Sequence, residues 1–434
     1  MTHEQAAESG RGEETIFTWG APPLKFGPGA VDEVGFEMAQ LGAKRVLVLT
    51  DPGLVATGVP HRILESLQGV GIAAEIFDGV HVEPTDDSMA KAIGYAGEQG
   101  PWDGFVAVGG GSVIDTAKAV NLLTTYPGEL MDYVNKPVGK AMAPPGPLKP
   151  LIAIPTTAGT GAESTAMCIM DILSLKVKTG ISHWRLRPTR AIVDPLLTMT
   201  LPPEVTAASG MDIVCHALES YTARWYETYD RKTPEQRVTY CGSNPVSDLW
   251  SEGSMSLLAA AFRRAVRHGT EDVQARSDMM LAATFAGMGF GNAGVHIPHA
   301  NGYPIAGMVK DYHPTGYPQD EAMVPHGQAV SLTAPQAFRF SFSSAPERHL
   351  RAAALLAPDH PKHNEPAEQL PSVLIDLMRD IGIPNGIGGV GYDESDVADL
   401  VPGTMKQQRL LATCPREVTA EDIEQILTNS IQNW

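Results

Sequence analysis

Between about residues 45 and 195, short aliphatic and β-branched runs alternate with segments that repeat apolar residues at helical spacing. Strands that alternate with helices in this way indicate βαβ crossovers and a mostly parallel sheet. The strand-like runs are RVLVLTD (45–51), AAEIFDGV (73–80), GFVAVGGGS (104–112), LIAIPTT (151–157) and AIVDP (191–195), and the helical ones are HRILESLQGVG (61–71), SMAKAIGYAGEQG (88–100) and VIDTAKAVNLL (113–123).

Beyond about residue 200 the strand-like runs nearly vanish and long helical periodicities follow. They cover residues 211–225, 247–269 and 277–290, and return near the C-terminus. At 434 residues the chain exceeds the usual size of a single core. We therefore predict two domains, an α/β domain over residues 1–200 and an all-helical domain over residues 201–434. The proline- and glycine-rich stretch 140–150 and the stretch 231–245 are predicted to be a surface loop and a helix-breaking insertion.

A glycine-rich turn, Gly109 to Ser112, lies between a predicted strand and a predicted helix. Glycines let backbone N–H groups approach phosphate oxygens, and the helix begins with the positive end of its dipole there. Asp51 follows another predicted strand. An acidic residue at this position can hydrogen-bond a ribose hydroxyl of a nucleotide, or it can simply start a turn. Residues 155–163, PTTAGTGAE, offer donors to a nucleotide or form an ordinary helix-capping loop. The pattern favours a dinucleotide site but is not the GxGxxG fingerprint.

Four side chains in the second half form a candidate metal site. Asp212 and His216 are four residues apart, so on a helix they project from one face. His299 and His326 lie in HIPHANGYPIAG and VPHGQAV, and spacing alone does not separate His299 from His296. One carboxylate with imidazoles suits a first-row divalent metal such as Fe²⁺ or Zn²⁺. A phosphate turn followed by a metal site predicts a metal-dependent dehydrogenase.

The composition narrows the partners and the location. A hydrophobic fraction of 43% and a charged fraction of 19% are those of a soluble globular protein. A formal net charge of −18 opposes binding to nucleic acid or to an anionic membrane. No apolar run is long enough for a membrane span. The acidic, polar N-terminus and four dispersed cysteines, taken as reduced thiols, predict a cytoplasmic protein.

Three motifs in order resemble one family, the iron-containing (group III) alcohol dehydrogenases. They are GGGSVIDTAKA, PTTAGTGAE and GMDIVCHALESY, and the similarity extends from about residue 17 to near the C-terminus. The resemblance implies a dehydroquinate synthase-like fold, with an α/β NAD-binding domain and a helical metal-binding domain. It also implies Fe²⁺, with Zn²⁺ as an alternative, and a homodimer or larger homo-oligomer. The implied metal ligands are Asp212, His216, His299 and His326.

The same resemblance assigns the cofactor contacts. Asp51 would bind the adenosine ribose, and Gly109, Gly110, Gly111 and Ser112 the pyrophosphate. Asp115 belongs to the same motif, where it either contacts the cofactor or supports the helix. The remaining implied contacts are Thr156, Thr157 and Thr160 along the cofactor and Lys178 at a ribose or phosphate.

Two departures from the common family pattern stand out. Tyr303 occupies a position at which many members carry a histidine that handles a proton, so Tyr303 becomes a candidate catalytic residue. The segment MVKDYHPTGYPQDEA (308–322) lengthens the gap between the third and fourth ligands. With HVEPTD and GSNPVSDLW, these features resemble a transhydrogenase branch of the family.

That branch implies a reaction in which bound NAD carries hydride from 4-hydroxybutyrate to 2-oxoglutarate, giving succinate semialdehyde and 2-hydroxyglutarate. The alternatives are an ordinary NAD-dependent alcohol dehydrogenase or aldehyde reductase that releases free NADH, and a binding protein without turnover. Carboxylate substrates need a local cation against the net negative charge. The candidates are Lys176, Arg185, Arg187, Arg190 and Lys310, unless these form a solvated basic face.

Overall fold

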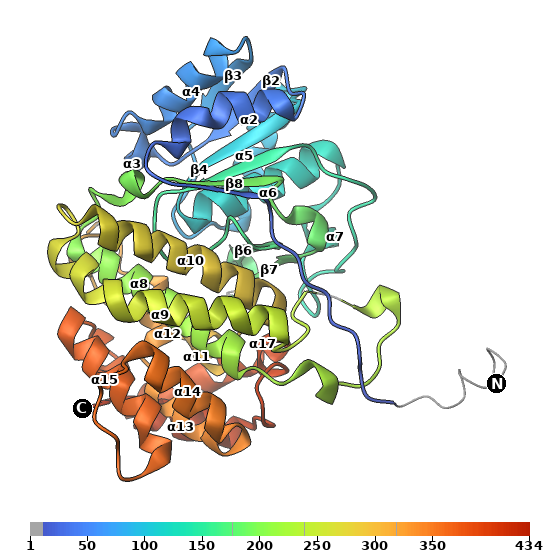
Figure 1. The fold of residues 1–434 in the computed structure, drawn as a ribbon. Coiled ribbons are helices and arrows are strands. Elements are labelled where there is room, and N and C mark those ends of the chain that lie inside the picture. Colours follow the sequence, from blue (N-terminus) through green and yellow to red (C-terminus); the bar gives the residue numbers. More distant parts are fainter. Residues whose placement is uncertain (1–11, 176, 238, 318) are drawn as a thin grey trace.

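The computed structural model describes residues 12–434 except residues 176, 238 and 318. Figure 1 shows a sheet region above a larger helical region. The sheet has six strands in the order β1-β8-β5-β4-β2-β3, and every neighbouring pair is parallel. The strands are β1 (Leu24–Phe26), β2 (Arg45–Leu49), β3 (Ala73–Phe77), β4 (Gly104–Gly109), β5 (Leu151–Pro155) and β8 (Arg190–Val193). The predicted parallel sheet is confirmed.

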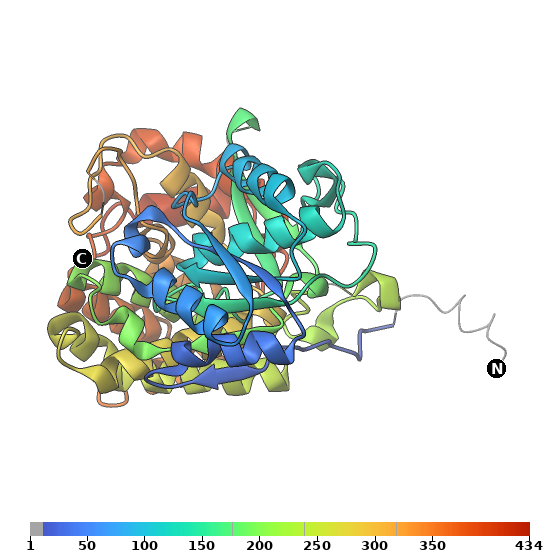
Figure 2. The ribbon, with the colours of Figure 1, turned by 90° about the horizontal axis from the view of Figure 1, so that it is seen from above.

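Helices cover both faces of this sheet, as Figure 2 shows from above. Successive strand residues point to opposite faces, and both faces are apolar, so the central strands read as continuous hydrophobic runs. Val46 and Val48 pack with α2 (Val34–Gln40) and α4 (Val59–Gly69), whereas Leu47 and Leu49 pack towards α5 (Asp86–Gln99) and α6 (Gly111–Thr125).

The strand order determines where the predicted cofactor segments lie. β4 lies between β2 and β5, with Leu49 level with Ala107 and Gly109 level with Pro155. Asp51, the glycine turn and the 155–163 loop therefore follow the carboxyl ends of three adjacent parallel strands. Ligands of open α/β sheets bind in the crevice at this edge.

The second half of the chain is helical and surrounds one large apolar core. No strand lies beyond β8 in the described residues, as predicted. None of the helices in the described ranges is both long and apolar enough to cross a membrane. The helices are α8 (Pro203–Thr222), α9 (Pro245–His268), α10 (Val273–Ala293), α11 (Ile297–Gly307), α12 (His326–Ser331), α13 (Ala334–Ser341), α14 (Pro346–Leu356), α15 (Gln369–Ile381), α16 (Val397–Met405), α17 (Gln408–Leu411) and α18 (Ala420–Asn429), and the sheet region adds the short α3 (Pro52–Val55) and α7 (Leu130–Tyr133).

An antiparallel hairpin of β6 (Met167–Ile172) and β7 (Val177–Ser182) was not predicted, and neither was the edge strand β1. Their short, mixed sequences lack a strong apolar alternation, and tertiary contacts stabilise them instead. The four cysteines are unpaired, as expected of reduced thiols. The division at residue 200 stays a prediction.

Candidate metal and cofactor site

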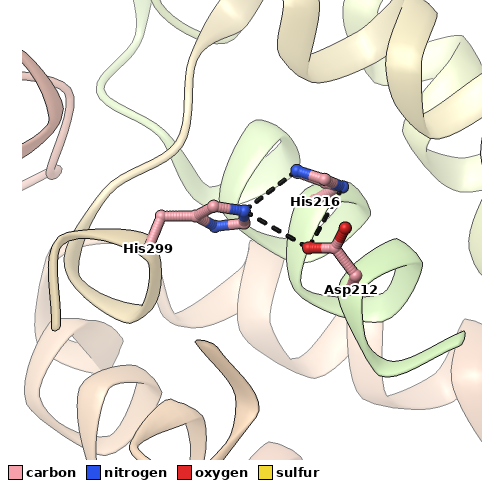
Figure 3. Close-up of side chains that lie close together, drawn as sticks. All are labelled: Asp212, His216 and His299. Atoms are coloured by element: carbon pink, nitrogen blue, oxygen red, sulfur yellow. Dashed lines mark hydrogen bonds and ion pairs between the residues drawn. The ribbon is translucent and has the colours of Figure 1, made fainter. Parts of the chain in front are cut away.

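Helix α8 supplies two side chains of the metal cluster. Asp212 and His216 are buried and lie on one face of the helix, with 3.7 Å between Asp212 Oδ1 and His216 Nδ1. His299, from the first turn of α11, points at both of them (Figure 3). Its Nε2 is 3.5 Å from Asp212 Oδ1 and 2.9 Å from His216 Nε2. The three ligand atoms lie within 4.8 Å of one another.

His326, the fourth predicted ligand, begins α12 and approaches from another side. Its Nε2 is 3.8 Å from Asp212 Oδ1, and its ring meets the His299 ring edge-on with centroids 5.5 Å apart. Gly327 brings α12 against α8, since a Cβ there would lie 2.0 Å from the carbonyl oxygen of Ala208. All four predicted ligands therefore converge on one place, with His326 at its edge.

The structure separates His299 from its neighbour His296. The Nε2 atom of His296 lies 3.0 Å from the hydroxyl of Thr222, and its ring packs edge-on against Phe338. His296 is thus a buried residue with its own partner. His299 is the histidine of this pair that faces Asp212 and His216.

The chemistry of the cluster fits a divalent cation. Asp212 Oδ1 and His216 Nδ1 are buried without a hydrogen-bond partner among the described residues, although buried polar atoms are normally paired. Burial opposes charge on Asp212, yet His216 and His326 hold its pKa below the usual range. Burial lowers the pKa of His216 to about 3, so its imidazole is neutral and able to ligate. Such a set suits Fe²⁺ or Zn²⁺.

Glu219 is a site residue that the sequence analysis missed. Its fully buried carboxylate accepts hydrogen bonds from the backbone N–H groups of His296 and His299, at 3.2 and 3.0 Å, and from the Nδ1 of His299. Burial opposes charge on His299, but Glu219 raises its pKa to about 9. A signal was present, because Asp212, His216 and Glu219 are spaced four and three residues apart on one helix face.

The glycine turn has the close packing that its sequence predicts. A Cβ at Gly109 would lie 2.4 Å from Val113, and one at Gly111 would lie 2.8 Å from the Thr160 side chain. Gly110, the N-cap of α6, has only Thr157 near its Cβ position, at 3.6 Å. The backbone is therefore tightly packed at Gly109 and Gly111. Between them, at the start of α6, the space beside Gly110 is open.

The remaining cofactor candidates adjoin this turn. Thr156 is buried and its N–H donates to the carbonyl of Gly109, while Thr157 and Thr160 flank the turn. Asp51 caps α3 by accepting from the N–H of Leu54 at 3.0 Å. The structure therefore gives Asp51 a helix-capping contact at the predicted edge of the sheet, and its ribose contact stays a prediction.

Asp115 makes two contacts that support the fold. Its carboxylate accepts from the Lys118 ammonium at 3.2 Å and from the N–H of Ile169 at 3.0 Å. Lys118 is fully buried and also donates to the carbonyls of Ala162 and Met167. These contacts hold α6 to the β6–β7 hairpin, and a cofactor contact of Asp115 stays a prediction.

Lys178 lies in an acidic pair beside the glycine turn. On β7, its ammonium lies 2.6 Å from Glu83 Oε2 and 2.9 Å from Asp171 Oδ2. The N–H of Glu83 donates to the Ser112 hydroxyl of the glycine turn at 3.1 Å. Lys178 lowers the pKa of Glu83 against burial, and the charge of His326 acts in the same direction. Glu83, which was not predicted, thus links Lys178 to the glycine turn.

Tyr303 lies on α11 one turn after His299, and its ring stacks on His326 with centroids 6.3 Å apart. Burial raises the pKa of the Tyr303 phenol well above its ordinary value. Its hydroxyl therefore stays protonated. In the inserted segment, the Tyr312 hydroxyl donates to the Gln328 side chain of α12 at 3.3 Å.

This chain matches a known enzyme family over most of its length. Residues 22–195 match the iron-containing alcohol dehydrogenase family, and residues 235–431 match its C-terminal region. The hydroxyacid-oxoacid transhydrogenase of Bos taurus is 42% identical over 99% of this chain and 94% of its own length, and that of Homo sapiens is 41% identical over the same shares. The crystal structure of a 1,3-propanediol oxidoreductase has a TM-score of 0.83 and 30% identity, covering 96% of this chain and all of its own.

These relatives correct one prediction and establish the family. Both transhydrogenases are named as mitochondrial, so the prediction of a cytoplasmic location is wrong and the comparison points to the mitochondrion. Unpaired cysteines do not identify a compartment, so they could not carry that prediction. The two matched regions together span most of the sequence. The chain is an oxidoreductase that belongs to the iron-containing alcohol dehydrogenase family.

Proposed function

We propose that this protein transfers hydride from 4-hydroxybutyrate to 2-oxoglutarate through bound NAD, using Fe²⁺ as its metal. One structural observation carries the proposal. Gly159 of the loop after β5 abuts Ser209 of α8, one turn before Asp212, so the candidate cofactor edge and the metal helix are in direct contact. The names of the full-length relatives supply the substrate class. Zn²⁺ is the alternative metal because it accepts the same ligands.

In this proposal Asp212, His216, His299 and His326 hold the metal. A divalent ion bound there would polarise the substrate oxygen and stabilise negative charge on it. Phe290 stacks on the His216 ring, with centroids 3.8 Å apart, and excludes water from that side. Lys178 would contact the cofactor beside Ser112. The Tyr303 ring packs on the His326 ring, and the Tyr303 phenol keeps its own proton.

The identity of residue 303 favours a transhydrogenase over an ordinary dehydrogenase. Oxidation of the hydroxyacid releases one hydride and one proton, and reduction of the oxoacid consumes both. The complete cycle therefore needs no net proton exchange with solvent. A buried tyrosine that stays protonated suits such a cycle better than a reaction that must export a proton in each turnover.

The test is a reaction with iron-loaded protein and no added nucleotide. Supplied with 4-hydroxybutyrate and 2-oxoglutarate, the enzyme should form 2-hydroxyglutarate, detected by mass spectrometry, only when both substrates are present. The His216→Ala variant should form none. Product that appears only after NAD is added, with NADH accumulating from one alcohol, would establish the ordinary dehydrogenase instead. Activity retained by His216→Ala would contradict the metal site.

We further propose that the protein is a homodimer or larger homo-oligomer, and that residues 1–200 and 201–434 are its two domains. Size-exclusion chromatography with light scattering tests the assembly. A monomeric mass would overturn that part of the proposal without affecting the reaction.

A further inference from the structure

A negatively charged protein that acts on carboxylates needs a cation beside its reaction centre. The cations proposed from the sequence are engaged elsewhere, and Lys176 lies outside the described residues. Arg190 pairs with Glu37, and Lys310 pairs with Asp396 at 2.6 Å. Arg185 bonds the carbonyl of Pro144 and Arg187 that of Ser164. The basic stretch therefore serves the fold.

Arg409, at the start of the short helix α17, has a different environment. Its Nη1 lies 3.1 Å from the Ser182 hydroxyl and 3.8 Å from the Met167 sulfur, and its guanidinium lies 4.6 Å from the ring centre of Tyr240. All three neighbours are neutral. None of the contacts found for the half-buried Arg409 in the described part of the chain is an ion pair with a carboxylate. Its positive charge is therefore not neutralised locally.

The position of Arg409 relates it to the reaction centre through β7 and α11. Alternate residues of a strand share a face, so Lys178 and Ser182 lie on the same side of β7. Arg409 contacts Ser182, and the neighbouring Gln407 side chain donates to the carbonyl of Lys178 at 3.4 Å. Figure 1 shows α17 beside α11, the helix that carries His299 and Tyr303.

Lys178 is the other cation on this side of β7. Lys178, however, already contacts two carboxylates, Glu83 and Asp171. A substrate carboxylate placed beside Lys178 would meet their negative charges. Arg409 is the cation beside β7 and α11 that has no such competitor among the described residues.

The two proposed substrates place the same demand on such a cation. In 4-hydroxybutyrate and in 2-hydroxyglutarate, two methylene groups separate the carbon bearing the hydroxyl from a carboxylate. The corresponding aldehyde and oxoacid keep this spacing. One cation at a fixed distance from the reacting carbon can therefore bind all four compounds with that carbon in the same position. The second carboxylate of 2-oxoglutarate and 2-hydroxyglutarate needs a separate binding position.

We propose that Arg409 is the anchor for this shared carboxylate, and thus determines the preference for hydroxyacids over neutral alcohols. The inference rests on the proposed function, because that function supplies the spacing. An arginine suits the role, since its planar guanidinium binds carboxylates through two parallel hydrogen bonds.

The experiment compares Arg409→Gln, Arg409→Lys and wild-type holoenzyme on 4-hydroxybutyrate and on butane-1,4-diol, a neutral analogue. Loss of a charge-assisted anchor should lower kcat/KM for 4-hydroxybutyrate about 100-fold, mainly through KM. The loss with the diol should be at least tenfold smaller, and Arg409→Lys should recover part of the activity. Arg416→Gln is the matched control, because Arg416 bonds the Phe340 carbonyl and lies outside the site.

The outcomes separate the anchor from the reaction. Equal losses on both substrates, or none on either, would overturn the anchor. If the wild type oxidises the diol but no hydroxyacid, the proposed function fails. The anchor is then judged by glutarate, a dicarboxylate with no hydroxyl group, as an inhibitor competing with the diol. Inhibition that Arg409→Gln weakens supports the anchor, and inhibition that is absent or unchanged overturns it.

Discussion

Glu219 binds both the imidazole ring and the backbone N–H of His299. A carboxylate at the Nδ1 of a metal-binding histidine fixes the ring so that its other nitrogen faces the ion. Here Nε2 of His299 is directed at Asp212 and His216. The same carboxylate also accepts the His296 N–H at the beginning of α11, so it positions the helix as well as the ring.

We therefore predict that Glu219→Gln weakens metal binding about 10- to 100-fold. The amide keeps the size of the side chain but loses the charge that orients His299. Competition with a chelator of known affinity, followed by metal analysis, measures the effect directly. Glu204→Gln, an exposed change in the first turn of the same helix, is the control. Metal affinity equal to that of the wild type would show that Glu219 acts only on α11.

Adjacent glycines of the phosphate turn should respond differently to an added methyl group. Gly110→Ala places its Cβ at ordinary contact distance from Thr157, at 3.6 Å, so the fold should tolerate it. The methyl would nevertheless occupy the open side of the turn, where we propose that the pyrophosphate binds. NAD affinity should fall at least tenfold while the melting temperature changes little. Calorimetric titration with NAD and a thermal melt test both parts.

Gly109→Ala should instead destabilise the protein. Its Cβ would lie 2.4 Å from the Val113 side chain, and a clash with a buried residue typically costs about 1–3 kcal/mol. A lower melting temperature for Gly109→Ala than for Gly110→Ala is the expected order. Unaltered NAD binding in Gly110→Ala would argue against the turn as the pyrophosphate site.

The sequence predicted the features that depend on local pattern. Buried parallel strands are apolar on both faces, so the runs around Val46 and Val106 were recognisable. The spacing of Asp212 and His216 likewise predicted a shared helix face. The choice between His296 and His299 was not a local matter. It depends on the Thr222 hydroxyl at the end of α8, which is 74 residues before His296 in the sequence.

Features that depend on long-range pairing were missed for the same reason. Arg190 looked available for a substrate, yet it pairs with Glu37, which is far away in the sequence. Lys178 pairs with the nearby Asp171 and also with Glu83, which lies far away in the sequence on the loop after β3. Arg409 had no motif to identify it, because its role follows from contacts with β7 and α11. The charges that surround a site are thus less predictable than its metal ligands.

A buried histidine away from the site should make stability depend on pH. His349 of α14 lies between Phe338 and Phe342, and its ring nitrogens bond Ser341 Oγ at 3.0 Å and the Ala345 carbonyl at 2.8 Å. Burial lowers its pKa from 6.5 to about 4. The folded protein therefore binds fewer protons at this position than the unfolded chain between these two values.

Because the unfolded state takes up the proton first, the contribution of neutral His349 is fully present above pH 6.5 and is lost as the pH falls towards 4. The total loss for a shift of this size is about 3 kcal/mol. His349→Gln removes the titrating ring but keeps a polar side chain, so its free energy of unfolding should fall less than that of the wild type between pH 7.5 and pH 4.5. Urea unfolding at both pH values measures the difference, with the exposed His268→Gln change at the end of α9 as the control for loss of an imidazole. If the free energy of unfolding depended on pH equally in wild type and His349→Gln, protonation of the buried His349 ring would not destabilise the folded protein.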